Sequence, residues 1–280
     1  MALEERAPLD GTTRDDVCRP PSSALAGALR LVDYWAIVYR RTWKGSVVTS
    51  FVTPLFYVLA MGVLLGGFVE ADATTLQGAT SYLAFIAPGL VAAQAMTTAF
   101  GEMTYPVMGM VKWHRTYFGM IATPLRIADV VLSHLGFVLF RVATTCAVFL
   151  AVLAPFGVFG SVWGVVGAFV VQLLVGLAFA TVIHAFSAGL RDESAFSLLY
   201  RLAMIPLFLF SGAFFPVSSL GWLEIVARVT PLWHGVDLTR MLTLGRVDGA
   251  MAAVHGGYLA AMALAGWFWS VRRLTARMAT

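Results

Sequence analysis

The sequence predicts an all-α, polytopic membrane protein with six transmembrane helices. Hydrophobic residues make up 59% of its 280 residues and charged residues only 12%, about half the charged share of a typical soluble domain. The apolar residues also form continuous runs of about 20 residues, the length at which a helix crosses the hydrocarbon core of a bilayer. We expect helices because every backbone polar group in that core must be hydrogen-bonded within the protein.

The six predicted spans are the apolar runs, taken in chain order. They cover about 46–68, 82–107, 127–153, 162–187, 198–215 and 251–271. Since little of the chain remains, we expect a single membrane domain over 24–280 and no separate soluble domain. Residues 1–23 mix charges with turn-forming residues and lack the apolar core of a signal peptide, which predicts a disordered cytoplasmic tail.

The Lys and Arg residues near the span ends predict the orientation of the chain. If the N-terminus is cytoplasmic, eleven of these residues lie inside and three lie outside. The inner set is Arg40, Arg41, Lys44, Lys112, Arg115, Arg126, Arg191, Arg201, Arg272, Arg273 and Arg277, and the outer set is Arg228, Arg240 and Arg246. We therefore expect both termini in the cytoplasm. The net charge of +4 then reflects this bias and contact with anionic lipid headgroups, not nucleic-acid binding.

Two segments outside the spans are amphipathic. Residues 24–45 place Trp35 and Tyr39 on an apolar stripe, which predicts an interfacial helix with its aromatic rings at headgroup depth. The alternative is a plain cytoplasmic extension of the first span. Residues 216–248 are too charged for a span and too apolar for a free loop, so we expect two short re-entrant helices in the outer leaflet.

The basic segment KWHRTYFGMIATPLR, residues 112–126, joins the second and third spans. On a helical wheel it has one apolar and one polar face. The apolar face holds Trp113, Tyr117, Met120 and Ile121, and the polar face holds Lys112, Arg115, Thr116, Gly119 and Thr123. Pro124 should end the helix near Ala122, which leaves a rod of about 15 Å, too short to span. It is either an ordinary loop helix or a rigid lever that a soluble partner grips.

Three motifs together resemble the permease subunits of ABC-2 type exporters. They are RTYFGMIATPLRIADVVL at 115–132, FSGAFFP at 210–216 and TPLWHGVDLTR at 230–240. The family includes exporters of a nodulation lipooligosaccharide and of daunorubicin, and the resemblance extends from about Ala24 onward. It implies a bacterial plasma membrane protein with six spans, an interfacial helix, a cytoplasmic coupling helix and re-entrant outer helices.

The resemblance also implies partners and roles. The permease is expected to dimerise with itself or a homologous permease, and each copy is expected to bind one ABC ATPase subunit. The segment from about Lys112 to Ala122 becomes the coupling helix. The residues implied in ATPase coupling are Lys112, Trp113, Arg115, Thr116, Tyr117 and Met120.

The function predicted on this basis is outward transport of a lipophilic or lipid-linked cargo, powered by a separate ATPase. The sequence lacks the loop G-x-x-x-x-G-K-[ST], so ATP and Mg²⁺ are expected on the partner and no cofactor on this chain. No catalytic residue is expected. Two alternatives stay open: a secondary transporter or channel, and a membrane-embedded lipid-modifying enzyme, for which Glu102, Asp129 and His134 form the only near-cluster.

A polar site inside the membrane is suggested by Arg141, which lies in the middle of the third predicted span. Glu102 is the obvious counter-ion, but the predicted span ends place the two about nine residues, or about 13 Å, apart in depth. Arg141 then either makes a structural contact within the bundle or faces a cavity and attracts an anionic headgroup. We expect His134 and His184 to be packing residues, because no spacing completes a metal site.

Two further patterns are weaker. The aromatic residues between Phe208 and Trp222 either line a conduit or face lipid. The glycines of GVVGAFVVQLLVG, residues 164–176, suit close packing of helices. We consider a dimer seam as one place for that packing.

Overall fold

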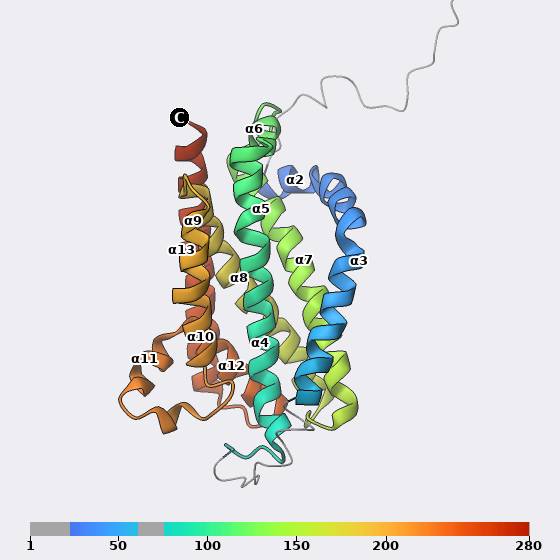
Figure 1. Cartoon of the computed structure of the whole chain (residues 1–280), viewed down its shortest axis with the longest axis vertical. Coiled ribbons are helices and arrows are strands. Elements are labelled where there is room, and N and C mark those ends of the chain that lie inside the picture. The colour runs from blue at the N-terminus through green and yellow to red at the C-terminus, as the bar shows by residue number, and fades with distance from the viewer. Residues whose placement is uncertain (1–22, 61–75, 280) are drawn as a thin grey trace, which may run out of the picture.

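The computed structural model describes residues 23–60 and 76–279, and every regular element within these ranges is a helix (Figure 1). The longer helices are α3 (Val32–Tyr57), α4 (Tyr82–Met103), α7 (Ile127–Leu153), α8 (Val162–Gly189), α12 (Pro231–Thr243) and α13 (Gly249–Met278). The shorter ones are α2 (Ala24–Leu29), α5 (Tyr105–Met108), α6 (Thr116–Ile121), α9 (Ser194–Leu199), α10 (Ile205–Leu209) and α11 (Leu223–Val229). The predicted tail lies outside these ranges, apart from Ser23, as do residues 61–68 of the predicted first span.

Helix α8 forms the centre of the bundle. It contacts α4, α7, α12 and α13, and its sequence is apolar on all sides, as expected of a helix surrounded by other helices. Ser161 begins it as an N-cap, accepting a hydrogen bond of 3.0 Å from the backbone N–H of Gly164. Helix α13 has α8 as a main neighbour, but few of its residues are fully buried.

Four helical segments are long and apolar enough to cross a membrane. They are Tyr82–Trp113, Ile127–Phe156, Val162–Gly189 and Gly249–Met278. They correspond to the predicted second, third, fourth and sixth spans. The first and fifth predicted spans, 46–68 and 198–215, overlap shorter apolar helical segments, Ser50–Ala60 and Ser194–Leu209. The six-span count therefore stays a prediction.

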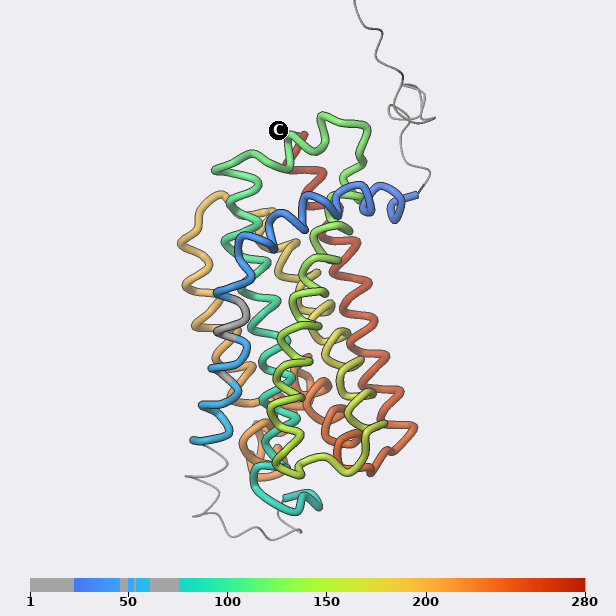
Figure 2. The backbone as a smooth tube through the Cα atoms, turned by 90° about the vertical axis from the view of Figure 1, so that its right-hand side faces the viewer, coloured from blue at the N-terminus to red at the C-terminus, as the bar shows by residue number. Residues whose placement is uncertain are grey.

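The N-terminal helices lie across one end of the bundle. Helix α2 is followed by a turn at Arg30 and Leu31, and α3 then continues without a break through Gly45 into the predicted first span. Figure 2 shows this segment crossing the end of the bundle and then turning along it. The predicted boundary near Gly45 between interfacial helix and first span stays a prediction, and α3 has no helix end there because no N-cap or proline interrupts it.

The opposite end of the bundle holds α11 and α12 (Figure 1). The two short helices expected over 216–248 are present, preceded by a 3₁₀ turn at Val217–Leu220. Arg240 of α12 is buried, with 3% of its surface exposed. Its guanidinium donates to the carbonyl oxygens of Phe85 at 3.3 Å and Gly212 at 2.7 Å, and to Gln77 Oε1 at 3.1 Å. Arg240 thus ties α12 to α4 and to the segment after α10.

The glycines of residues 164–176 pack within the chain. A Cβ added to Gly164 would lie 2.2 Å from the carbonyl oxygen of Leu242, and one added to Gly176 would lie 2.8 Å from a methyl group of Val142. These glycines therefore face α12 and α7. A dimer seam at these positions is wrong, because the space is already filled by this chain's own helices.

Candidate functional site

The backbone breaks inside the predicted coupling helix. The helix that begins at Tyr82 passes through a π-helical turn at Gly109–Trp113 and ends near His114. Arg115 then adopts a left-handed conformation, with φ 52° and ψ 28°, and α6 begins at Thr116. A single helix over Lys112–Ala122 is therefore wrong, because Lys112 and Trp113 extend the preceding helix. The expected end near Ala122 is confirmed, since α6 ends at Ile121 with Ala122 as its C-cap.

Tyr117 anchors α6 to the bundle. Its side chain is 0% exposed, and its hydroxyl lies 2.5 Å from His134 Nδ1 of α7 and 3.4 Å from His184 Nε2 of α8. Trp35 of α3 stacks on the His134 ring, with centroids 4.5 Å apart. Burial raises the pKa of Tyr117, so the phenol stays neutral; its one proton serves one of these hydrogen bonds, and its oxygen accepts the other.

The predicted coupling residues thus divide into an exposed and a buried set. Lys112, Trp113 and Arg115 are exposed, and Thr116 is half-buried. Tyr117 and Met120 are buried against the bundle. The wheel correctly put the last two on an apolar face, but Trp113 is 50% exposed, because the break at Arg115 rotates it out of that face.

Lys112 is joined to the segment between α8 and α9. Its Nζ lies 3.0 Å from Glu193 Oε2. The hydrogen bond from Lys112 lowers the pKa of Glu193 below its ordinary value of 4.5. Because the folded pKa is the lower one, this ion pair stabilises the fold above the unfolded pKa, and its contribution is lost as the pH falls through the folded pKa. The link is therefore intact at neutral pH.

Glu102 and Arg141 form a direct ion pair, with Arg141 Nε 2.9 Å from Glu102 Oε1. The depth argument against this pairing is wrong because it ended the second span at Val107, whereas the helical segment continues to Trp113. Measured from the corrected ends, the residues differ by about three positions, or about 4.5 Å. A long arginine side chain reaches across that distance. The structural contact is thus the alternative that the geometry supports.

The near-cluster considered for an enzyme is dispersed among separate contacts. Glu102 pairs with Arg141, His134 with Tyr117, and Asp129 accepts a hydrogen bond of 2.9 Å from the backbone N–H of Arg126 at the start of α7. Within residues 23–60 and 76–279, no group of three or more His, Cys, Asp or Glu side chains is placed to hold a metal ion.

A second polar cluster, at the end with α12, was not predicted. His234 Nδ1 lies 2.7 Å from His255 Nδ1, and His255 Nε2 lies 3.1 Å from Asp237 Oδ2. The ring of Tyr258 stacks on His234. The only signal in the sequence was His234 three positions before Asp237, which places both on one face of a helix. Their partner His255 is remote in sequence.

Comparison with known proteins identifies the family. The model of the ABC-2 type transporter family matches residues 30–244. The chain belongs to the ABC-2 type transporter family. The matched residues include all three sequence motifs and the Tyr117 cluster with His134 and His184. They also include His234 and Asp237 of the second cluster, but not His255 and Tyr258.

Named relatives of the ABC-2 family cover most of the chain. Nodulation protein J of Rhizobium leguminosarum bv. trifolii is 34% identical over 220 residues, 75% of this chain and 81% of its own length. Nodulation protein J of Rhizobium meliloti (strain 1021) is 30% identical over 87% of this chain and 94% of its own length. The daunorubicin resistance ABC transporter permease protein DrrB1 of Streptomyces coeruleorubidus is 26% identical over 93% of each chain.

Proposed function

We propose that this chain is the membrane-spanning permease subunit of an ATP-driven exporter that moves a lipophilic or lipid-linked cargo outward. The ABC-2 family match and the relative named as a daunorubicin resistance permease support a transport role. The helices long and apolar enough to cross a membrane supply the transmembrane part. The chain lacks a Walker A loop, so ATP and Mg²⁺ belong to a separate ABC ATPase.

The single observation that carries the ATPase proposal is the anchoring of α6. This short helix lies at one end of the bundle (Figure 1), and its Tyr117 is hydrogen-bonded into α7 and α8. A partner that moves α6 therefore moves two membrane helices with it. This anchoring supports a rigid lever over an ordinary loop helix.

The coupling residues take two roles in this proposal. Lys112, Trp113, Arg115 and Thr116 form the surface that meets the ATPase, which we name the coupling surface. Tyr117 and Met120 hold that surface to the bundle from below. We assign Glu102 and Arg141 a structural role, because their mutual ion pair neutralises two charges between α4 and α7.

The remaining features of the proposal concern topology and assembly. We infer six spans, with α3 and its continuation to about residue 68 as the first, and the helical segment Ser194–Leu209 with the residues that follow as the fifth. The end with α6 faces the cytoplasm of a bacterial cell, and α11 and α12 are re-entrant in the outer leaflet. Two permease copies, identical or homologous, assemble with two ATPase subunits.

Two measurements test this proposal: co-purification of the chain with an ATPase, and ATP-dependent transport by the pair. The full chain is expressed with the ABC ATPase encoded beside its gene, and ATP-dependent uptake of daunorubicin into inside-out vesicles is measured. We expect the two subunits to co-purify and uptake to require both. Arg115→Glu reverses an exposed charge on the coupling surface and should lower ATPase retention at least tenfold, about 1.4 kcal/mol.

The matched control is Arg246→Glu, the same exchange at an exposed arginine three residues after α12, a helix at the opposite end of the bundle from α6. It should leave ATPase retention unchanged. Uptake that persists without any ATPase, or equal effects of the two variants, would contradict the proposed coupling.

A further inference from the structure

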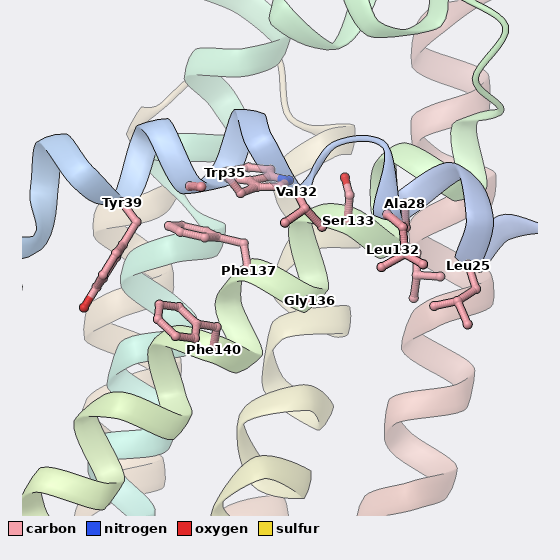
Figure 3. Close-up of a pocket in the computed structure, with 12 residues that line it drawn as sticks. Leu25, Ala28, Val32, Trp35, Tyr39, Leu132, Ser133, Gly136, Phe137 and Phe140 are labelled. Carbon is pink, nitrogen blue, oxygen red and sulfur yellow. The ribbon is translucent and has the colours of Figure 1, made fainter. Parts of the chain in front are cut away.

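An apolar groove of about 560 Å³ separates the N-terminal helices from α7. Figure 3 shows its two walls, with Leu25, Val32 and Trp35 on one side and Gly136, Phe137 and Phe140 on the other. Its volume lies within the range of about 300–1,000 Å³ that is usual for small-molecule sites. The groove is therefore large enough for a ligand and apolar enough to favour a hydrocarbon chain.

The groove is open because α7 carries a glycine where a side chain would fill it. Gly136 is exposed, and a Cβ added there meets no atom within 4 Å. The surrounding apolar side chains also remain exposed: Leu25 by 63%, Val32 by 52% and Phe140 by 45%. An apolar chain lying in the groove would cover all three.

One polar group in the wall of the groove has no hydrogen-bond partner among the described residues. Trp35 is only 8% exposed, and its indole Nε1 is buried without a hydrogen-bond acceptor. The ring is fixed by stacking on His134 and Phe137, with centroids 4.5 and 4.6 Å away. In Figure 3 its nitrogen lies on the side toward Val32 and Ser133. Because an unpaired buried N–H is costly, the occupant should supply an acceptor oxygen next to its apolar chain.

The segment that forms one wall of the groove carries a positive net charge. Residues 24–45 contain one acid, Asp33, and four cations, all of them exposed. The cations are Arg30, Arg40, Arg41 and Lys44. Such a basic, amphipathic helix attracts the headgroups of anionic lipids.

We propose that the groove binds one anionic phospholipid of the surrounding membrane. Its acyl chain lies between α2–α3 and α7, an ester carbonyl oxygen accepts the hydrogen bond from Trp35 Nε1, and the phosphate lies beside the basic residues of the same helices. The lipid is bound by this chain alone and is not the exported cargo. The inference goes beyond the proposed function and does not depend on an ATPase.

Photocrosslinking tests this site on the full chain. The protein is reconstituted without ATPase in phosphatidylcholine vesicles that contain a small share of phosphatidylglycerol with a diazirine on its acyl chain. After illumination, lipid adducts are mapped by peptide mass spectrometry. We expect adducts concentrated on 25–39 and 132–140, reduced at least fivefold by excess unlabelled phosphatidylglycerol.

Gly136→Leu supplies the decisive variant. The leucine fills the groove without a backbone clash and has a higher helix propensity than glycine. It should lower the amount of mapped adduct at least tenfold, while the protein keeps its thermal stability. Gly257→Leu is the matched control, since this exposed glycine of α13 also has open space around it. Trp35→Phe keeps the ring and removes the N–H, and should weaken competition by phosphatidylglycerol about fivefold.

Three results would overturn the assignment. Adducts spread evenly around the helices, or unchanged in Gly136→Leu, mean that the lipid belongs to the general annulus. If a different acylated molecule co-purifies with the protein and is lost in Gly136→Leu, the occupant of the groove is the cargo and not a membrane phospholipid. Protein–protein crosslinks through the groove assign it to a second copy of the chain.

Discussion

Tyr117 shows how one side chain can connect a surface helix to the membrane bundle. Its hydroxyl is shared by His134 and His184, from two different helices. Trp35 stacks on one of these histidines, so α3 also belongs to the cluster. The four residues of this cluster, Trp35, Tyr117, His134 and His184, are all far apart in the sequence.

Tyr117→Phe should therefore destabilise the protein although it keeps the ring. Removing the hydroxyl leaves His134 and His184 without this buried partner, which costs about 1–3 kcal/mol. We expect a lower midpoint of thermal unfolding in detergent and weaker coupling of ATP hydrolysis to transport. Tyr105→Phe is the control, because Tyr105 is exposed and its ring contact with Phe196 does not need the hydroxyl. Equal midpoints for the two variants would remove Tyr117 from its anchoring role.

Glu102 and Arg141 should be strongly coupled. Each single neutralisation, Glu102→Gln or Arg141→Gln, leaves a largely buried charge without its counter-ion and should cost about 2–4 kcal/mol. The double variant should recover about 1–3 kcal/mol of the summed losses, as a double-mutant cycle of unfolding free energies measures. Additive losses would show that the ion pair contributes nothing of its own.

At the scale of helices, close packing of α8 against α12 depends on Gly164. An added methyl group would meet the backbone oxygen of Leu242, which is not the end of a flexible side chain. This approach explains why the small-residue pattern of 164–176 is an intramolecular feature.

Gly164→Ala should lower the unfolding free energy by about 1–3 kcal/mol, because one of the two helices must shift. Gly256→Ala, at a position of α13 with open space, should instead be neutral or stabilising by up to about 1 kcal/mol. Chemical denaturation of both variants in the same detergent makes the comparison. A stabilised Gly164→Ala protein would contradict the packing described here.

The helices and several of their ends were predictable from the sequence, such as α7 at Ile127–Leu153, but the end of the second predicted span was not. Long apolar runs specify four of the helices, because nothing else satisfies the backbone in a bilayer. The end at Trp113 was missed, since a π-helical turn and a left-handed Arg115 leave no mark in hydropathy. The Glu102–Arg141 pair was then rejected for the same reason. The wheel still identified Tyr117 as a buried-face residue, because α6 itself is regular.

At the scale of the whole molecule, the two ends of the bundle are built from different helices. One end holds α2, α6 and the C-terminal end of α13, and the other holds α11 and α12 (Figure 1). The sequence predicted this division from the distribution of Lys and Arg. The partners across the bundle, such as His255 for His234, depend on tertiary packing and could not be found by spacing.

Cysteine labelling should reveal the orientation directly. In a background of Cys18→Ser and Cys146→Ala, we introduce Trp222→Cys, at a residue that is 79% exposed, or Gly119→Cys on the exposed side of α6. A membrane-impermeant maleimide applied to intact cells should label the first at once and the second only after permeabilisation. The reverse pattern would place the coupling surface outside the cell and exclude a cytoplasmic ATPase there.

The break at Arg115 has a consequence for how force would enter the bundle. The chain turns there between the end of the α4 segment and α6, while Tyr117 fastens α6 to α7 and α8. Helix α6 also contacts the turn Gly109–Trp113 that ends the α4 segment. A load applied to α6 would therefore be divided among three membrane helices and would not pass along a single one.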